Sequence, residues 1–244
     1  MVLARGFAVV LLLESTVRAA PEEIQVYMDE MNARGQFGLD AHNSYVATGH
    51  STDGYVGEQQ SLHRYRITPE LAYGLAPSFE LGLYLPLATI GRDGVGIDGV
   101  KARLKFIAPD HHDQIWFWGA NFEIGVVDHG LDANPYNAEL KGIVGLRSGP
   151  WTIALNANLD LKVYGPASAP PSLELAGKLG YLVTRTIALG VETYNDPFGL
   201  GDDSSFATVD ARWGGWDLDL GVGSGYGENP DRFIIKAIVG IPID

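Results

Sequence analysis

The chain has 244 residues, a formal net charge of −13 and no cysteine. The length fits one large domain or two small ones, the negative charge argues against a nucleic-acid partner, and the lack of cysteine excludes a disulfide framework. After residue 20 no apolar run approaches the roughly 20 residues that a membrane-spanning helix needs, and there is no Gly-rich phosphate loop and no Cys/His zinc spacing.

Residues 1–19 are predicted to be a secretory signal peptide. Arg5 supplies positive charge, residues 7–13 form an apolar run, and Val17-Arg18-Ala19 fits the small-residue rule for cleavage after Ala19. The alternative is a buried N-terminal helix. Residues 20–34 are acidic and alternate poorly, so we expect a short helix or an irregular arm there.

From residue 35 onward, apolar and polar side chains alternate in segment after segment, which is typical of half-exposed strands. The clearest hairpin spans residues 69–87, where five apolar side chains from Phe79 to Leu87 share one face opposite Glu80. Pro69 suggests a bulge or a local break in pairing. The predicted strands are 35–48, 61–75, 79–87, 99–108, 114–128, 136–147, 151–164, 173–183, 187–195, 206–213, 216–226 and 232–243.

The connections between these strands alternate in length. Short turns follow the even-numbered strands, and mostly longer polar loops follow the odd-numbered ones, at 49–60, 91–98, 129–135, 165–172, 196–205 and 227–231. Outer-membrane barrels sort their loops in this way, whereas a soluble Greek-key sandwich does not. Aromatic residues near the segment ends fit two interfacial girdles, with Phe79, Trp151, Trp213 and Trp216 beside the short turns and Tyr45, Tyr65 and Tyr226 near the long loops.

The predicted fold is therefore all-β: a transmembrane, antiparallel, up-and-down β-barrel of about 12 strands over residues 35–244, with a short N-terminal periplasmic arm at 20–34. The predicted location is the outer membrane of a Gram-negative cell. The expected partners are outer-membrane lipids and lipopolysaccharide, the barrel insertion machinery and small solutes, with no nucleic acid and no cofactor.

Most basic side chains fall on the polar, inward face together with a nearly equal number of acids. One interpretation is structural, with opposite charges linking neighbouring strands in a narrow interior. The other is a narrow pore for small polar or charged solutes, with a basic wall opposite acids that creates a transverse field. The residues of this predicted lumen wall are Arg64, Arg66, Lys101, Arg103, Lys105, Glu80, Asp217 and Asp219.

Other candidate sites carry weaker signals. Asp110-His111-His112-Asp113 has metal-ligand side chains, but adjacent residues rarely chelate one ion alone, so a polar turn is favoured. The acidic loops fit a solvated rim better than a calcium site. A lipid hydrolase needs Ser and His at the lipid-facing rim; His42 and Ser44 face inward, and His63 with Ser61 lacks an evident partner. No catalytic residue and no metal site is predicted, and the protein is not expected to be an enzyme.

Several short runs resemble a family of uncharacterised proteobacterial outer-membrane β-barrel proteins of the porin or transporter kind. They are Glu23 to Tyr27, Asp29 to Asn32, Gly35 to Leu39 with His42 and Tyr45, Arg66 to Glu70, Ser78 to Pro86, Lys101 to Phe106, Gly119 to Glu123 and Lys236 to Ile238. The resemblance spans most of the predicted mature chain and implies the location and the fold, without an activity or a site. The chain departs from the usual barrel C-terminus, because it ends in Ile241-Pro242-Ile243-Asp244 rather than in an aromatic residue.

Overall fold

The computed structural model describes residues 23–52, 55–91, 94–109, 115–164, 171–198, 203–227 and 230–243. The predicted signal peptide and the Asp110–Asp113 segment lie outside the described residues. The described residues form twelve strands: β1 (Phe37–Thr48), β2 (Tyr65–Ala76), β3 (Phe79–Gly91), β4 (Gly94–Ile107), β5 (Trp116–Val127), β6 (Tyr136–Ser148), β7 (Trp151–Tyr164), β8 (Ser172–Leu182), β9 (Ile187–Asn195), β10 (Asp203–Trp213), β11 (Trp216–Tyr226) and β12 (Phe233–Ile241).

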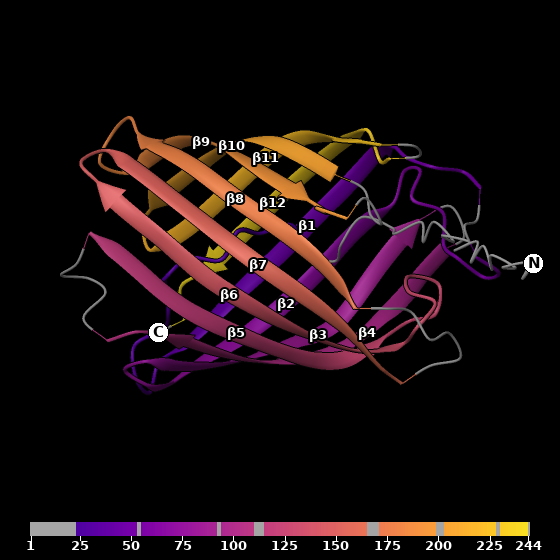
Figure 1. The fold of residues 1–244 in the computed structure, drawn as a ribbon, viewed down its shortest axis with the longest axis horizontal. Helices are drawn as coiled ribbons and strands as arrows, with labels where there is room; N and C mark the ends of the chain where they lie inside the picture. The colour runs from indigo at the N-terminus through magenta and orange to yellow at the C-terminus, as the bar shows by residue number, and fades with distance from the viewer. Residues whose placement is uncertain are drawn as a thin grey trace, which may run out of the picture.

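Each strand pairs antiparallel with its neighbours in sequence, and β1 pairs with β12, so the sheet closes into a barrel (Figure 1). Within each strand, successive side chains point alternately to the inner and the outer face of this closed sheet. On β7, Ala154 and Asn156 are buried in the interior, whereas Ile153 and Leu155 are exposed on the outer surface. Because the outward face is apolar strand after strand, the exterior is suited to lipid and the polar face is turned inward. The predicted fold is confirmed.

Most strand boundaries agree with the sequence pattern to within two residues, but β2 begins at Tyr65 rather than at residue 61 and β10 begins at Asp203 rather than at residue 206. The largest difference lies at the connection between β3 and β4. The long loop expected over 91–98 is wrong, because β3 continues to Gly91 and β4 already begins at Gly94. Thr89 pairs with Gly96, and Ile90 pairs with Val95. Glycines interrupt the apolar alternation of this stretch. The sequence pattern therefore did not predict that the pairing of β3 with β4 continues there.

Pro69 disturbs the pairing on one side of β2 only. The register of β2 with β3 shifts between Ile67 and Glu70, whereas the pairing with β1 runs through Pro69, opposite Ala41. A proline lacks the N–H that a ladder hydrogen bond requires, which accounts for the predicted local break.

The predicted aromatic side chains lie at the two ends of the barrel. Trp151 and Trp216 begin β7 and β11, and Trp213 ends β10, all beside short turns and all exposed. Trp151 packs edge-on against Tyr181 of β8, with 4.7 Å between ring centroids. We name this end the short-turn end and the opposite one the long-loop end.

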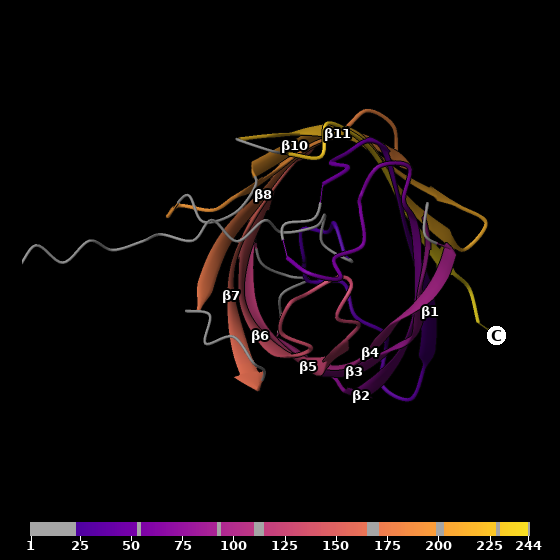
Figure 2. The same cartoon turned by 90° about the vertical axis from the view of Figure 1, so that its right-hand side faces the viewer.

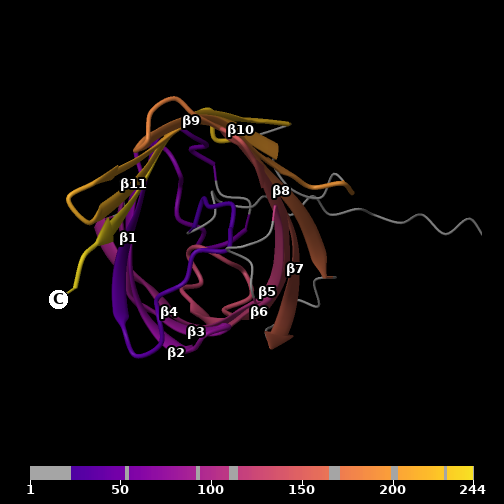
Figure 3. The ribbon, with the colours of Figure 1, turned by 90° about the vertical axis from the view of Figure 1, so that its left-hand side faces the viewer.

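Residues 23–34, which we name the arm, lie inside the barrel (Figures 2 and 3). Ile24, Val26 and Tyr27 are buried among side chains of the wall, and the arm reaches the short-turn end before Gly35 leads into β1. The arm is irregular over its described length and contains no helix. Of the two forms expected from the sequence, a short helix or an irregular arm, the described residues adopt the irregular one, and their side chains contact the lumen wall. No helix among the described residues is long and apolar enough to cross a membrane.

Candidate functional site: the lumen and its arm

Tyr27 fixes the arm in the middle of the lumen. Its hydroxyl lies 2.7 Å from the hydroxyl of Tyr84 on β3 and donates to Glu123 Oε1 on β5 at 3.2 Å. Its backbone is held by the Asn156 side chain on β7, which accepts from the Tyr27 N–H at 2.6 Å and donates to the Tyr27 carbonyl at 2.9 Å. The arm is therefore tied to three strands of the wall, β3, β5 and β7, through one residue.

Three cations of the wall surround the Tyr27 ring. Lys141 Nζ lies 4.6 Å from the ring centroid, Lys105 Nζ lies 5.4 Å away, and Arg103 Cζ lies 5.8 Å away. The face of an aromatic ring attracts a cation, more strongly where water is excluded. The ring thus fills the space between these three cations, which β4 and β6 contribute.

Near the short-turn end, the arm continues to use wall residues. Asn32 donates to Glu80 Oε2 from its backbone N–H at 2.6 Å and from its side chain at 2.9 Å. Asp29 forms a bidentate pair with Arg147 of β6. The absence of a side chain at Gly74 lets the arm approach closely, since a Cβ there would lie 2.2 Å from the Ala33 carbonyl oxygen.

The predicted lumen wall is brought together in part. Arg103 and Glu80 are buried and paired at 2.8 Å, and Arg103 also pairs with Glu70 at 2.5 Å. Lys105 donates to the Glu30 carbonyl of the arm at 2.7 Å. Arg66 is also buried in the interior, and Lys101 is half-buried.

The other members of the predicted wall lie elsewhere. Arg64 lies at the long-loop end, where it donates to the Gln59 carbonyl at 3.0 Å. Asp217 is exposed at the short-turn end and pairs with Arg212 at 2.8 Å. Asp219 binds Lys178 and Lys236 in a second charge cluster. The charges therefore do not form two continuous opposed walls, and the carboxylates interleave with the cations.

The second cluster is centred on Glu192 of β9, whose side chain is fully buried in the interior. Its two oxygens pair with Lys236 at 2.5 Å and Lys178 at 3.0 Å. Lys236 also donates to the Ile24 carbonyl of the arm at 3.1 Å. Alternation in β8, β9 and β12 predicts the inward direction of these three side chains, but only the three-dimensional pairing shows that they meet.

At the long-loop end, the β1–β2 loop is fastened to the β11–β12 loop by three buried side chains, which we name the latch: His50, Ser61 and Asp231. Ser61 Oγ donates to Asp231 and lies 2.8 Å from His50 Nδ1, and His50 Nδ1 lies 3.5 Å from Asp231 Oδ1. The interaction with Asp231 raises the pKa of His50 above its usual value. Burial opposes ionisation of Asp231, but hydrogen bonds from His50 and Ser61 lower the pKa of its carboxyl.

The latch does not have the form of a hydrolytic site. Ser61 is fully buried and contacts the same His50 nitrogen that faces Asp231, so the imidazole does not relay between the two. His63, considered with Ser61 from the sequence, instead lies beside Tyr45 Oη at 3.1 Å. His42 pairs with Glu70 rather than with Ser44.

The same end holds a polar cavity of about 540 Å³. It lies where the β1–β2 loop meets the β5–β6 loop, and Gln59 N–H donates to the Gly130 carbonyl at 2.6 Å across the contact. Its lining includes Glu58, Gln59, Gln60, Asp128 and His129. The lining therefore presents amide, imidazole and carboxylate groups.

Sequence reasoning missed the central role of the arm. Tyr27, Glu23 and Asp29 lie in a stretch without strand periodicity, and the contacts that position them come from β3, β5, β6 and β7. The available signal was compositional: apolar Ile24, Val26 and Tyr27 stand among acids just before the first strand. The apolar side chains of such a segment can be buried, and its carboxylates can pair with the inward cations.

No protein-family model and no curated protein matches the chain. Among solved structures, the chain is similar to the KdgM porin in complex with disordered oligogalacturonate, at 10% identity and a TM-score of 0.57, covering 85% of this chain and 99% of that one. It is similar to an outer membrane channel from Pseudomonas putida F1, at 14% identity and a TM-score of 0.54, covering 89% and 99%. It is also similar to the NanC porin, at 9% identity and a TM-score of 0.55, covering 84% and 99%. The chain therefore shares the barrel fold of these porins and this channel.

Proposed function

We propose that the protein is a narrow outer-membrane pore for small polar or charged solutes, exported by a cleaved signal peptide. The observation that carries this proposal is the closed barrel with an apolar exterior and an interior lined by charged and amide side chains. A barrel with an apolar exterior needs a bilayer around it, and its polar interior offers a path for solutes. The porin and channel folds described above support the same proposal.

The arm would set the width of this path. It is held by side-chain contacts within the lumen and does not belong to the twelve-stranded ladder. Its displacement therefore breaks no pairing between strands of the wall. We expect the native protein to conduct weakly and a variant without residues 23–33 to conduct more.

Single-channel recording in planar bilayers tests the proposal. The native protein and the variant lacking residues 23–33 are compared, and heat-modifiable gel mobility verifies that both are folded barrels. No conductance from either protein at any voltage would overturn the pore.

The role of the predicted basic wall needs a separate test. Neutralising Arg64, Arg66, Lys101, Arg103 and Lys105 together should change ion selectivity. Lys101→Gln alone is the variant that disturbs the fold least, since Lys101 is the least buried of the five. The reversal potential under a salt gradient gives the result. An unchanged potential would remove this wall from the mechanism.

A closed structural barrel, acting through its loops or arm, is the second candidate. The filling of the lumen by Tyr27 and its partners favours it. A folded variant without the arm that still fails to conduct would support this alternative. Under either proposal the barrel contacts outer-membrane lipids and lipopolysaccharide and depends on the insertion machinery.

A further inference from the structure

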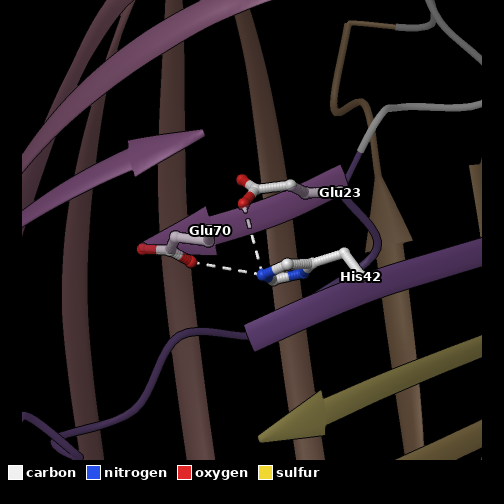
Figure 4. A group of neighbouring side chains, drawn as sticks. All are labelled: Glu23, His42 and Glu70. Atoms are coloured by element: carbon white, nitrogen blue, oxygen red, sulfur yellow. Dashed lines mark hydrogen bonds and ion pairs between the residues drawn. The ribbon is translucent and has the colours of Figure 1, made fainter. Parts of the chain in front are cut away.

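Three side chains of the kinds that ligate metals converge in the lumen (Figure 4). Glu23 comes from the arm, His42 from β1 and Glu70 from β2. Their nearest ligand atoms all lie within 4.8 Å of one another, with His42 Nε2 at 3.2 Å from Glu70 Oε2 and 3.9 Å from Glu23 Oε1. We propose that they bind one divalent transition-metal cation of the Zn²⁺ class, which clamps the arm to the barrel wall.

Each carboxylate is oriented by contacts at its other oxygen. Glu70 Oε1 pairs with Arg103 Nη2 at 2.5 Å. Glu23 Oε2 lies 3.3 Å from the Tyr27 hydroxyl oxygen and 3.8 Å from Lys141 Nζ. The remaining oxygens, Glu70 Oε2 and Glu23 Oε1, are the two that face His42 Nε2, as Figure 4 shows.

Glu23 Oε1 gives the second, independent indication of a cation. The Glu23 side chain is only 8% exposed, and Oε1 accepts no hydrogen bond from the residues that the structure describes. His42 Nε2 can donate a single hydrogen, and Glu70 Oε2 is its nearer partner. A buried carboxylate oxygen without a donor is costly, and a cation bound between the three atoms would satisfy it.

The geometry needs little change to accept an ion. Metal–ligand distances of about 2.0–2.2 Å in tetrahedral zinc sites place neighbouring ligand atoms about 3.3 Å apart. The pair His42 Nε2 and Glu70 Oε2 already meets this spacing. Glu23 is the ligand that must move inward, and it lies on the irregular arm rather than on a strand. One imidazole and two carboxylates suit Zn²⁺ and its neighbours better than Ca²⁺ or Mg²⁺, which favour oxygen alone. A water molecule or a solute oxygen would complete the tetrahedron.

The surrounding charge also favours a cation. Among the described residues, the ion pairs linked to His42 join five carboxylates, Glu23, Glu70, Glu80, Glu123 and Glu139, to Arg103 and Lys141. The two fixed cations reduce the affinity by repulsion but do not neutralise the cluster.

Metal binding by the full chain in detergent micelles tests the proposal, with Co²⁺ as an optical probe and Zn²⁺ in isothermal titration calorimetry. We expect one ion per chain and visible absorption bands of low-coordinate Co²⁺. Glu23→Gln and His42→Gln should each weaken binding by about tenfold or more. The matched controls are Asp219→Asn, a carboxyl paired with Lys178 and Lys236 in the second charge cluster, and His63→Gln; both should bind like the native protein.

The clamp has its own readout. Because Glu23 belongs to the arm and the other two ligands belong to the wall, the ion should slow amide hydrogen exchange over residues 24–34, and Glu23→Gln should abolish the slowing. Glu23→Gln alters no strand, and heat-modifiable mobility verifies its fold. The site is overturned if neither ion binds or if both ligand variants bind as the native protein does, and the clamp is overturned if binding leaves arm exchange unchanged. None of these outcomes depends on conductance, so failure here and failure of the pore are separate results.

Discussion

At the scale of single residues, the two partners of an ion pair depend on each other more strongly in the interior of the barrel than at its rim. Glu192 and Lys236 are both almost fully buried, and each has a further ionic partner. Arg212 and Asp217 form a pair of similar length, but both side chains are more than half exposed. Removing one partner of a buried pair leaves a charge without compensation, whereas water replaces an exposed partner.

We therefore expect Lys236→Ala to lower the free energy of unfolding by about 3 kcal/mol. Arg212→Ala is the matched control, and it should change the free energy of unfolding by no more than about 0.5 kcal/mol. Urea unfolding in lipid vesicles, followed by tryptophan fluorescence, measures both. Equal losses in the two variants would contradict the distinction between interior and rim.

At the scale of elements, close approach of the arm to β2 depends on Gly74. A Cβ at this position would lie 2.2 Å from the Ala33 carbonyl oxygen and 2.5 Å from that of Asn32, both of them backbone atoms. Gly74→Ala should therefore push the arm away from the wall. We expect faster hydrogen exchange over residues 30–34 and, if the arm narrows the path, a larger conductance.

Gly142→Ala is the control for this variant. Gly142 lies on the outer face of β6, and a Cβ added there meets nothing within 4 Å. Its arm exchange should equal that of the native protein. If the two glycine variants have the same arm exchange, contact with Gly74 does not position the arm.

The latch should give the long-loop end a dependence on pH. The raised pKa of His50 means that its stabilising contribution is complete below the unfolded value of about 6.5 and is lost as pH rises through the folded value. The lowered pKa of Asp231 means that its contribution is complete above the unfolded value of about 3.9 and is lost as pH falls through the folded value. The latch is therefore strongest between about pH 4 and about pH 6.5.

Hydrogen exchange of the Leu62 amide, which bonds to the His50 carbonyl at 3.3 Å, reports on the latch. After correction for intrinsic exchange, its protection should be greater at about pH 6 than at about pH 9. His50→Gln should flatten this difference. A variant with the native pH dependence would exclude His50 as the cause.

At the scale of the whole molecule, the apolar exterior predicts that charge is tolerated according to depth in the bilayer. Leu220 lies near the middle of β11 and faces outward, and Tyr226 ends the same strand. Leu220→Arg should lower the free energy of unfolding by about 2–4 kcal/mol, and Tyr226→Arg by about 0–1 kcal/mol. Unfolding in vesicles measures both, and the reverse order would contradict the proposed bilayer position.

The wall of the barrel was predictable because its information is local. Alternation places Leu155 outward and Asn156 inward whatever the partner strand is, and an apolar exterior requires closure. The connection near Gly94 was not predictable in this way, since glycines carry no hydrophobic signal. The proposed metal site was even harder to predict from the sequence. Glu23, His42 and Glu70 come from three segments, and nothing in their spacing indicates that a non-periodic arm returns through the lumen to bring them together.

Gly35 joins the arm to β1, and this order along the chain constrains assembly. The pairing of β1 with β12 joins the two ends of the sheet across the longest separation in sequence. Residues 23–34 precede β1 and lie within the ring that this seam completes. The seam strands enclose the arm, and Lys236 of β12 donates to its Ile24 carbonyl. We therefore expect a variant without the arm to change the kinetics of barrel closure even where the finished wall is the same.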